Sequence, residues 1–195
     1  MARLARLSVA GYPHHVIQRG NNRQAIFLDE PDYEASARHR VGLHAWVLLP
    51  GQLQLLATPP DAESLPRMMQ DVGRAYVRAF NNRHLRSGTL WEGRYRNTVV
   101  DPDLLLHAMA CLDSLPVREH LARSPEAYPW SSSAHYTGER SERMVTPPAQ
   151  IWQLGNTPFA RESAYRNLLH SHEAGQDCAR FEEAAPGGWG WGSDD

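Results

Sequence analysis

The chain has 195 residues, 42% of them hydrophobic and six of them tryptophan. This is enough for one ordinary domain with a small second lobe. The net charge of −2 argues against a globally basic nucleic-acid binder. No apolar run is long enough for a membrane helix or a signal peptide, so we expect a soluble, cytoplasmic protein with no membrane partner.

The charge is unevenly distributed along the chain. Residues 1–123 hold fifteen of the twenty basic residues and twelve of the twenty-two acidic ones, so this part carries +3 and residues 124–195 carry −5. Every basic residue is arginine, and seven lie between Arg67 and Arg96. A local basic stretch is compatible with phosphate binding, and equally with a solvated helix face.

In chain order, the first predicted elements are a strand at 14–19, a turn at 20–22 and a helix at 29–40. Strands at 43–49 and 52–57 follow, and Pro50-Gly51 joins them into a hairpin. Gln52 and Gln54 then point to the same face of the second strand.

A long helix is predicted over 64–82, with Ser64 as its cap and an apolar stripe that includes Tyr76. A glycine-containing loop at 83–96 leads to a short strand at 97–100. The next helix begins at Asp101 and is expected to stop before Pro116. Together these elements predict an α+β protein with a mainly antiparallel sheet.

Three parts are expected: a domain over 1–138, a linker and small helical C-terminal lobe over 139–185 with a helix at 159–169, and a flexible tail over 186–195. Cys111 and Cys178 show neither metal-ligand spacing nor a disulfide framework. We expect two reduced thiols.

Four stretches, in order, resemble the REP-associated tyrosine transposases, a branch of the HUH single-strand DNA transposases. They lie at 13–27, at 44–50 (His-Ala-Trp-Val-Leu-Leu-Pro), at 73–81 with 88–96, and at 116–118 with 128–132. The resemblance implies a ferredoxin-like antiparallel sheet with helices packed on one face. It also implies binding to palindromic or hairpin DNA, with a histidine pair that holds Mg²⁺ or Mn²⁺ and a helix tyrosine that attacks the phosphate.

The chemical positions of that family differ in this chain. The histidine pair aligns with Gln52 and Gln54, and the nucleophile with Cys111. The polar residue four positions later aligns with Leu115. Glutamine is a poorer ligand than imidazole for such metals, and a thiol attacks phosphodiesters poorly. We therefore expect no bound metal cofactor and no intact catalytic residue.

DNA contacts are expected from arginines and aromatic residues of the basic stretch and from a polar turn near the first strand. Trp91 and Tyr95 are expected to be exposed, and Tyr76 to be in the core. The candidates are Arg19, Asn22, Arg23, Arg74, Arg78, Arg83, Arg86, Trp91, Arg94, Tyr95 and Arg96.

The leading interpretation is a transposase-derived DNA-binding protein without catalytic activity, in the manner of a transcriptional regulator. One alternative is an active HUH transposase that cuts hairpin single-stranded DNA with a displaced tyrosine. Another is a protein-interaction module that does not bind DNA. The sequence leaves the choice between monomer and homodimer open.

Overall fold

The computed structural model describes residues 8–20, 38–85, 87–172, 178–179 and 181. Residues 21–22 of the expected turn, residues 29–37 of the expected helix and the tail at 186–195 lie outside the described residues.

Four strands form the sheet: β1 (His14–Arg19), β2 (Gly42–Leu49), β3 (Gln52–Thr58) and β4 (Arg96–Val99). Their order is β2-β3-β1-β4, and every neighbouring pair is antiparallel. This is the ferredoxin-like order, so the expected α+β class is confirmed. The hairpin turns at Gly51, whose φ of 93° suits a residue without a Cβ.

Helix α2 (Ser64–Arg83) begins where expected, but Ser64 is not its cap. The carboxylate of Asp61 accepts hydrogen bonds from the backbone N–H groups of Glu63 and Ser64, at 2.9 and 2.8 Å. One side of the helix buries Leu65, Met68 and other apolar residues in the core. The helix therefore combines a buried stripe with an exposed arginine face.

A short 3₁₀ turn, η2 (Pro102–Leu104), leads into α3 (Leu105–Arg118). The prediction that this helix stops before Pro116 was wrong, because Pro116 lies inside its last turn. A proline there removes one N–H bond near the end, while its own carbonyl accepts from the N–H of Leu121 at 2.8 Å. The helix thus continues for two residues beyond the proline.

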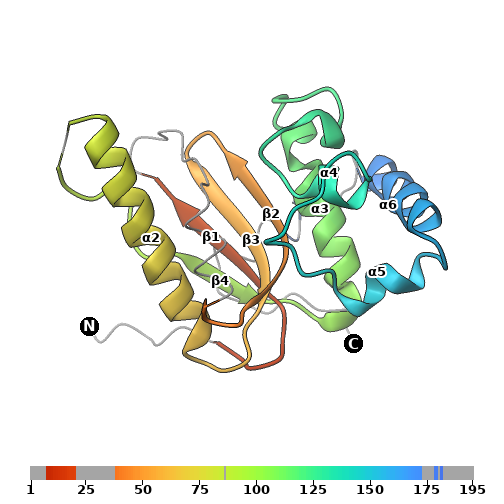
Figure 1. Ribbon diagram of the computed structural model, residues 1–195, viewed down its shortest axis with the longest axis horizontal. Helices are drawn as coiled ribbons and strands as arrows, with labels where there is room; N and C mark the ends of the chain where they lie inside the picture. The colour runs from red at the N-terminus through yellow and green to blue at the C-terminus, as the bar shows by residue number, and fades with distance from the viewer. Residues whose placement is uncertain (1–7, 21–37, 86, 173–177, 180, 182–195) are drawn as a thin grey trace.

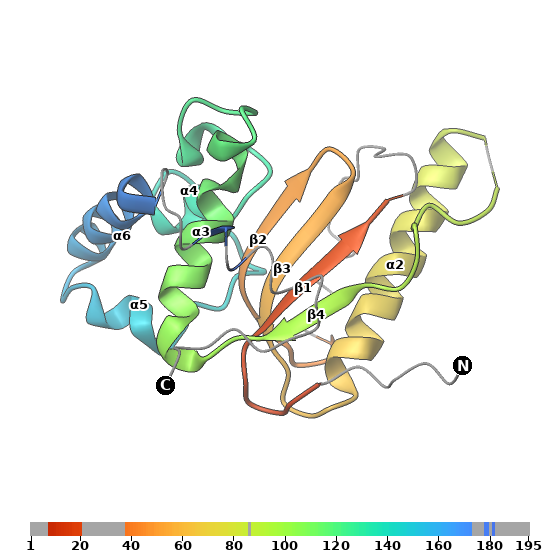
Figure 2. The ribbon, with the colours of Figure 1, turned by 180° about the vertical axis from the view of Figure 1, so that it is seen from behind.

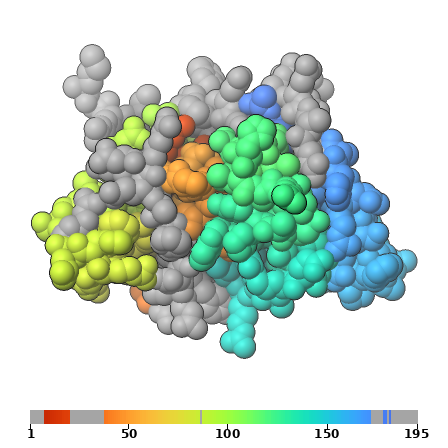
Figure 3. Space-filling view, turned by 90° about the horizontal axis from the view of Figure 1, so that it is seen from above, coloured from red at the N-terminus to blue at the C-terminus, as the bar shows by residue number. Residues whose placement is uncertain are grey.

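After α3 come three short elements and one longer helix: η3 (Pro125–Ala127), α4 (Ser133–Tyr136), α5 (Ala149–Gln153) and α6 (Pro158–His172). The helix expected at 159–169 is therefore present as α6. In Figures 1 and 2 the sheet stands between α2 on one side and α3, α5 and α6 on the other. Viewed from above, the green α3 region lies beside the orange hairpin and the blue helix lies on the outer flank (Figure 3).

The outer edge of β2 is covered by residues 130–132. The N–H of Leu48 donates to the carbonyl of Trp130, and the N–H of Ser132 donates to the carbonyl of Trp46, both at 2.9 Å. Val47 and Ser131 form an antiparallel bridge. This segment fastens the part of the chain after α3 to the sheet.

A fully buried carboxyl group, Asp113 of α3, lies where α3, α6 and β2 meet. Ser132 Oγ donates to its Oδ1 at 2.7 Å, and the hydroxyl of Tyr165 on α6 donates to its Oδ2 at 2.8 Å. Burial raises the pKa of Asp113 to about 7, against the opposing effect of these two bonds. Burial therefore favours the protonated, uncharged form of Asp113 in the folded protein.

Candidate nucleic-acid interface

Two adjoining hollows lie between α2 and the segment 88–95. They have volumes of about 360 and 540 Å³ and share Gln18, Met69 and Gln70 as lining residues. Arg67 and Arg94 line the smaller one, and Arg74, Arg78 and Trp91 line the larger one. We call this the α2 groove; it is bordered by four arginines.

Trp91 is held in the α2 groove by a close approach to the helix. Its Nε1 donates to the carbonyl of Gly73 at 3.3 Å, and its ring centroid lies 5.2 Å from that of Tyr76. A Cβ at residue 73 would lie only 3.2 Å from Trp91 Nε1, so a glycine at this position allows the contact. Trp91 is therefore half-buried and not exposed as predicted, whereas Tyr76 packs against the core as predicted.

The prediction that Tyr95 is exposed was wrong. Its side chain is only 7% exposed and belongs to the hydrophobic core. Tyr95 immediately precedes β4 and lines the smaller hollow beside Met69 of α2, so packing under the helix determines its position. It is therefore not a platform on which bases could stack.

The other DNA candidates divide into three groups. The first group consists of exposed arginines that lie beside the α2 groove or at the nearby ends of α2 and β4: Arg74, Arg78, Arg83, Arg94 and Arg96. Arg19 is also exposed, but it borders a different cavity of about 470 Å³, together with Gln52, Glu92 and Glu119. Asn22, Arg23 and Arg86 lie outside the described residues.

Gln54 aligns with one histidine of the pair in the REP-associated tyrosine transposases, and its side chain is buried in the interior. It is 3% exposed, and its Oε1 lies 2.7 Å from Nε2 of His15. Burial lowers the pKa of His15 to about 4, so the imidazole is neutral and its Nε2–H donates to the amide oxygen. This pair is thus a buried hydrogen bond.

The C-terminal segment covers that pair. The ring of Phe181 stacks on His15 with centroids 4.2 Å apart, and both side chains are at most 1% exposed. Three residues earlier, Cys178 forms a disulfide with Cys111 of α3. The segment therefore closes the face of the sheet on which Gln54 lies.

The disulfide corrects the expectation of two reduced thiols. The fold brings the Cα atoms of Cys111 and Cys178 to 5.3 Å, within the usual range for a disulfide. A separation of 67 residues carries no spacing signature, so only the tertiary structure could reveal the pair. In this state Cys111 has no thiolate with which to attack a phosphate.

The residues at the positions that the resemblance assigns to the metal offer few ligand atoms for a divalent cation. The amide oxygen of Gln54 is engaged by His15, Leu115 offers no donor and is 2% exposed, and Gly51 has no side chain. The half-buried amide of Gln52 is the remaining side-chain donor among these positions. A hard cation needs several oxygen or imidazole ligands, and among these positions only Gln52 offers one. Glu92 and Glu119 border the same cavity as Gln52 but do not stand at these positions.

Three contacts were not predicted from the sequence: His15 with Gln54, Phe181 with His15, and His107 beside the disulfide. His107 and Cys111 are four residues apart on a predicted helix, a spacing that puts two side chains on one face. That spacing was the available signal. The sequence gives no such signal for Phe181, because its contact with His15 joins residues near opposite ends of the chain.

Comparison with known proteins gives a likeness in fold. No family model matches the chain, and no curated protein does. A solved structure of a REP-associated tyrosine transposase bound to a REP hairpin has a TM-score of 0.60 at 14% identity, covering 76% of this chain and 92% of the other. A candidate transposase from Deinococcus radiodurans R1 has a TM-score of 0.39 at 17% identity, covering 62% of this chain and 98% of the other. Within the described residues, no helix is long and apolar enough to cross a membrane. The chain has the fold of a REP-associated tyrosine transposase.

Proposed function

We propose that this protein is derived from a transposase and binds DNA without cutting it. The observation that carries the proposal is the α2 groove, where Arg67, Arg74, Arg78 and Arg94 border a hollow beside a half-buried tryptophan. Guanidinium groups contact phosphates in pairs of hydrogen bonds and stack on bases. The groove therefore has the chemistry of a single-strand binding surface.

Loss of cutting is the second part of the proposal. A buried histidine–glutamine pair and a disulfide occupy two of the positions where the family has its metal ligand and its nucleophile. Neither a Lewis acid nor an activated hydroxyl is available from these residues. Because the fold is retained around them, binding is the activity that can persist.

The ligand we propose is a structured DNA hairpin. A protein of the same fold has been solved with a REP hairpin, and a groove bordered by arginines suits the high phosphate density of such a structure. A DNA-binding protein of this kind would act in the cytoplasm as a transcriptional regulator. Mapping of bound genomic sites would identify its targets.

The binding test compares two double variants with the wild-type protein. Arg74→Ala/Arg78→Ala removes two groove arginines, and Arg123→Ala/Arg143→Ala removes two exposed arginines elsewhere, so the two variants have equal net charge. Fluorescence polarisation with labelled hairpin and duplex DNA is measured over a salt series. The groove variant should weaken binding and reduce the slope of log K against log salt by about 1.4 to 1.8, which corresponds to two phosphate contacts.

Two results would contradict the proposal. Equal affinity of both double variants and the wild-type protein would remove the α2 groove as the binding surface, and no binding at all would favour the protein-interaction module. Cutting is tested with hairpin single-stranded DNA and Mn²⁺ on a denaturing gel. We expect neither a shorter strand nor a protein–DNA adduct, and either one would favour an active transposase.

A further inference from the structure

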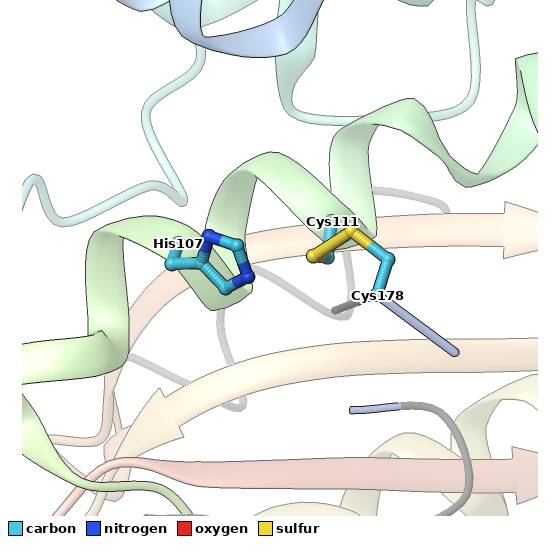
Figure 4. A group of neighbouring side chains, drawn as sticks. All are labelled: His107, Cys111 and Cys178. Atoms are coloured by element: carbon cyan, nitrogen blue, oxygen red, sulfur yellow. A yellow bond between two sulfur atoms is a disulfide. The ribbon is translucent and has the colours of Figure 1, made fainter. Parts of the chain in front are cut away.

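His107, Cys111 and Cys178 form a compact group outside the α2 groove. The candidate ligand atoms of the three side chains all lie within 4.8 Å of one another. His107 precedes Cys111 by one turn of α3, so the imidazole lies beside the sulfur atoms (Figure 4). Cys178 reaches the same point from the C-terminal segment.

We propose that these three residues are a redox-controlled zinc site. As a disulfide, the two sulfur atoms are bonded to each other and cannot bind a metal. As a dithiol, they and the imidazole supply two sulfur ligands and one nitrogen ligand, the set found in Cys₂His zinc sites that keep a fourth position open. The proposal does not depend on whether the protein binds DNA.

Zinc binding requires only a small increase in the distance between the two sulfur atoms. With Zn–S bonds of about 2.3 Å at a tetrahedral angle, the two sulfur atoms would be about 3.8 Å apart, and each sulfur about 3.6 Å from the nitrogen. Those separations fit inside the 4.8 Å already observed among the ligand atoms. Reduction frees the sulfur atoms to move from bonding distance to the separation that the metal needs.

The surroundings favour a metal in the reduced protein. Both cysteines are fully buried, where ionised thiols are costly unless a cation neutralises them. His107 is half-buried, which leaves a route for the ion and a place for a water as fourth ligand. Where cellular thiols are kept reduced, zinc would therefore replace the disulfide as the link between α3 and the C-terminal segment.

The steps balance chemically. A small dithiol reduces the disulfide, becoming oxidised itself, and leaves two protein thiols. Zn²⁺ then binds both sulfur atoms and displaces their two protons, while the neutral imidazole donates a lone pair. This site differs from the family's metal position, which corresponds to Gln52 and Gln54 on β3.

The test uses Co²⁺ as a spectroscopic probe with the full-length protein. After reduction and removal of the reductant under anaerobic conditions, Co²⁺ should bind with one-to-one stoichiometry. Thiolate-to-cobalt charge transfer should appear in the near ultraviolet, with intense visible bands typical of tetrahedral coordination. Zn²⁺ should displace the probe, and the oxidised protein should show none of these bands.

Two variants assign the ligands. His107→Ala keeps both cysteines and can be purified with its disulfide intact; after reduction it should bind Co²⁺ about ten-fold or more weakly. His170→Ala, an exposed histidine on α6, is the matched control and should bind like wild type. Cys178→Ser should lose the charge-transfer intensity of one sulfur. Absence of Co²⁺ binding by the reduced wild-type protein, or equal affinity in His107→Ala, would overturn the proposal.

Discussion

Replacing Asp113 with asparagine should remove a pH dependence from the stability of the protein. Asparagine has nearly the same shape, so Tyr165 can still donate to its oxygen, while its amide donates to Ser132 Oγ. Ser132 can in turn donate to the carbonyl of Trp46, which lies 3.3 Å away. The substitution therefore changes the titration and keeps the packing.

The magnitude follows from the pKa of Asp113. Burial raises it from 3.8 to about 7, so the folded protein holds this proton more tightly than the unfolded chain does. The contribution to stability is fully present below pH 3.8 and is lost as pH rises through 7. Three pKa units at about 1.36 kcal/mol each give a loss of about 4 kcal/mol between pH 4 and pH 7.5.

Urea denaturation of the oxidised protein at a series of pH values measures this contribution. The stability of Asp113→Asn relative to wild type should increase by about 4 kcal/mol between pH 4 and pH 7.5. Asp103→Asn, which alters an exposed carboxylate near the start of α3, should show no such trend. A difference between Asp113→Asn and wild type that stays constant with pH would refute the reasoning.

Three further predictions concern the C-terminal segment, with Cys178 and Phe181, and the His15 side chain on which it packs. Burial lowers the pKa of His15 from 6.5 to about 4, so its contribution to the free energy of unfolding is lost as pH falls from 6.5 to 4. In urea titrations His15→Gln should remove about 3 kcal/mol of this loss, and an unchanged loss of stability at low pH would contradict the prediction. Phe181→Ala should cost about 3 to 5 kcal/mol in the same assay because it empties the stack on His15, whereas a cost below about 1 kcal/mol would mean that the ring contributes little. With a chelator present, reducing the Cys111–Cys178 bond should lower the free energy of unfolding by about 4 kcal/mol, since it opens a loop of 67 residues, and Cys178→Ser should not respond to the reductant.

Much of the sheet could be predicted from local signals. Alternation and the Pro50-Gly51 turn define the hairpin, and β1 has the predicted bounds. The α2 stripe likewise separates the buried Met68 from the exposed Arg74. These features depend on neighbours in the chain, so a periodic pattern records them.

The features that could not be predicted from the sequence depend on contacts between residues far apart in the chain. Tyr95 is buried because α2 lies over it, and Cys111 is bonded because the chain returns to α3 after 67 residues. Neither contact leaves a periodic trace in the sequence. The raised pKa of Asp113 has the same origin, because it arises from burial among α3, α6 and the segment beside β2.

The cover on the outer edge of β2 has a consequence for self-association. An uncovered edge strand offers free N–H and C=O groups that another polypeptide can extend into a larger sheet. At β2 the backbone of Trp46 and Leu48 is already bonded to residues 130–132. Filament growth by strand addition is thereby blocked at the β2 edge. The other edge strand of the described sheet is β4.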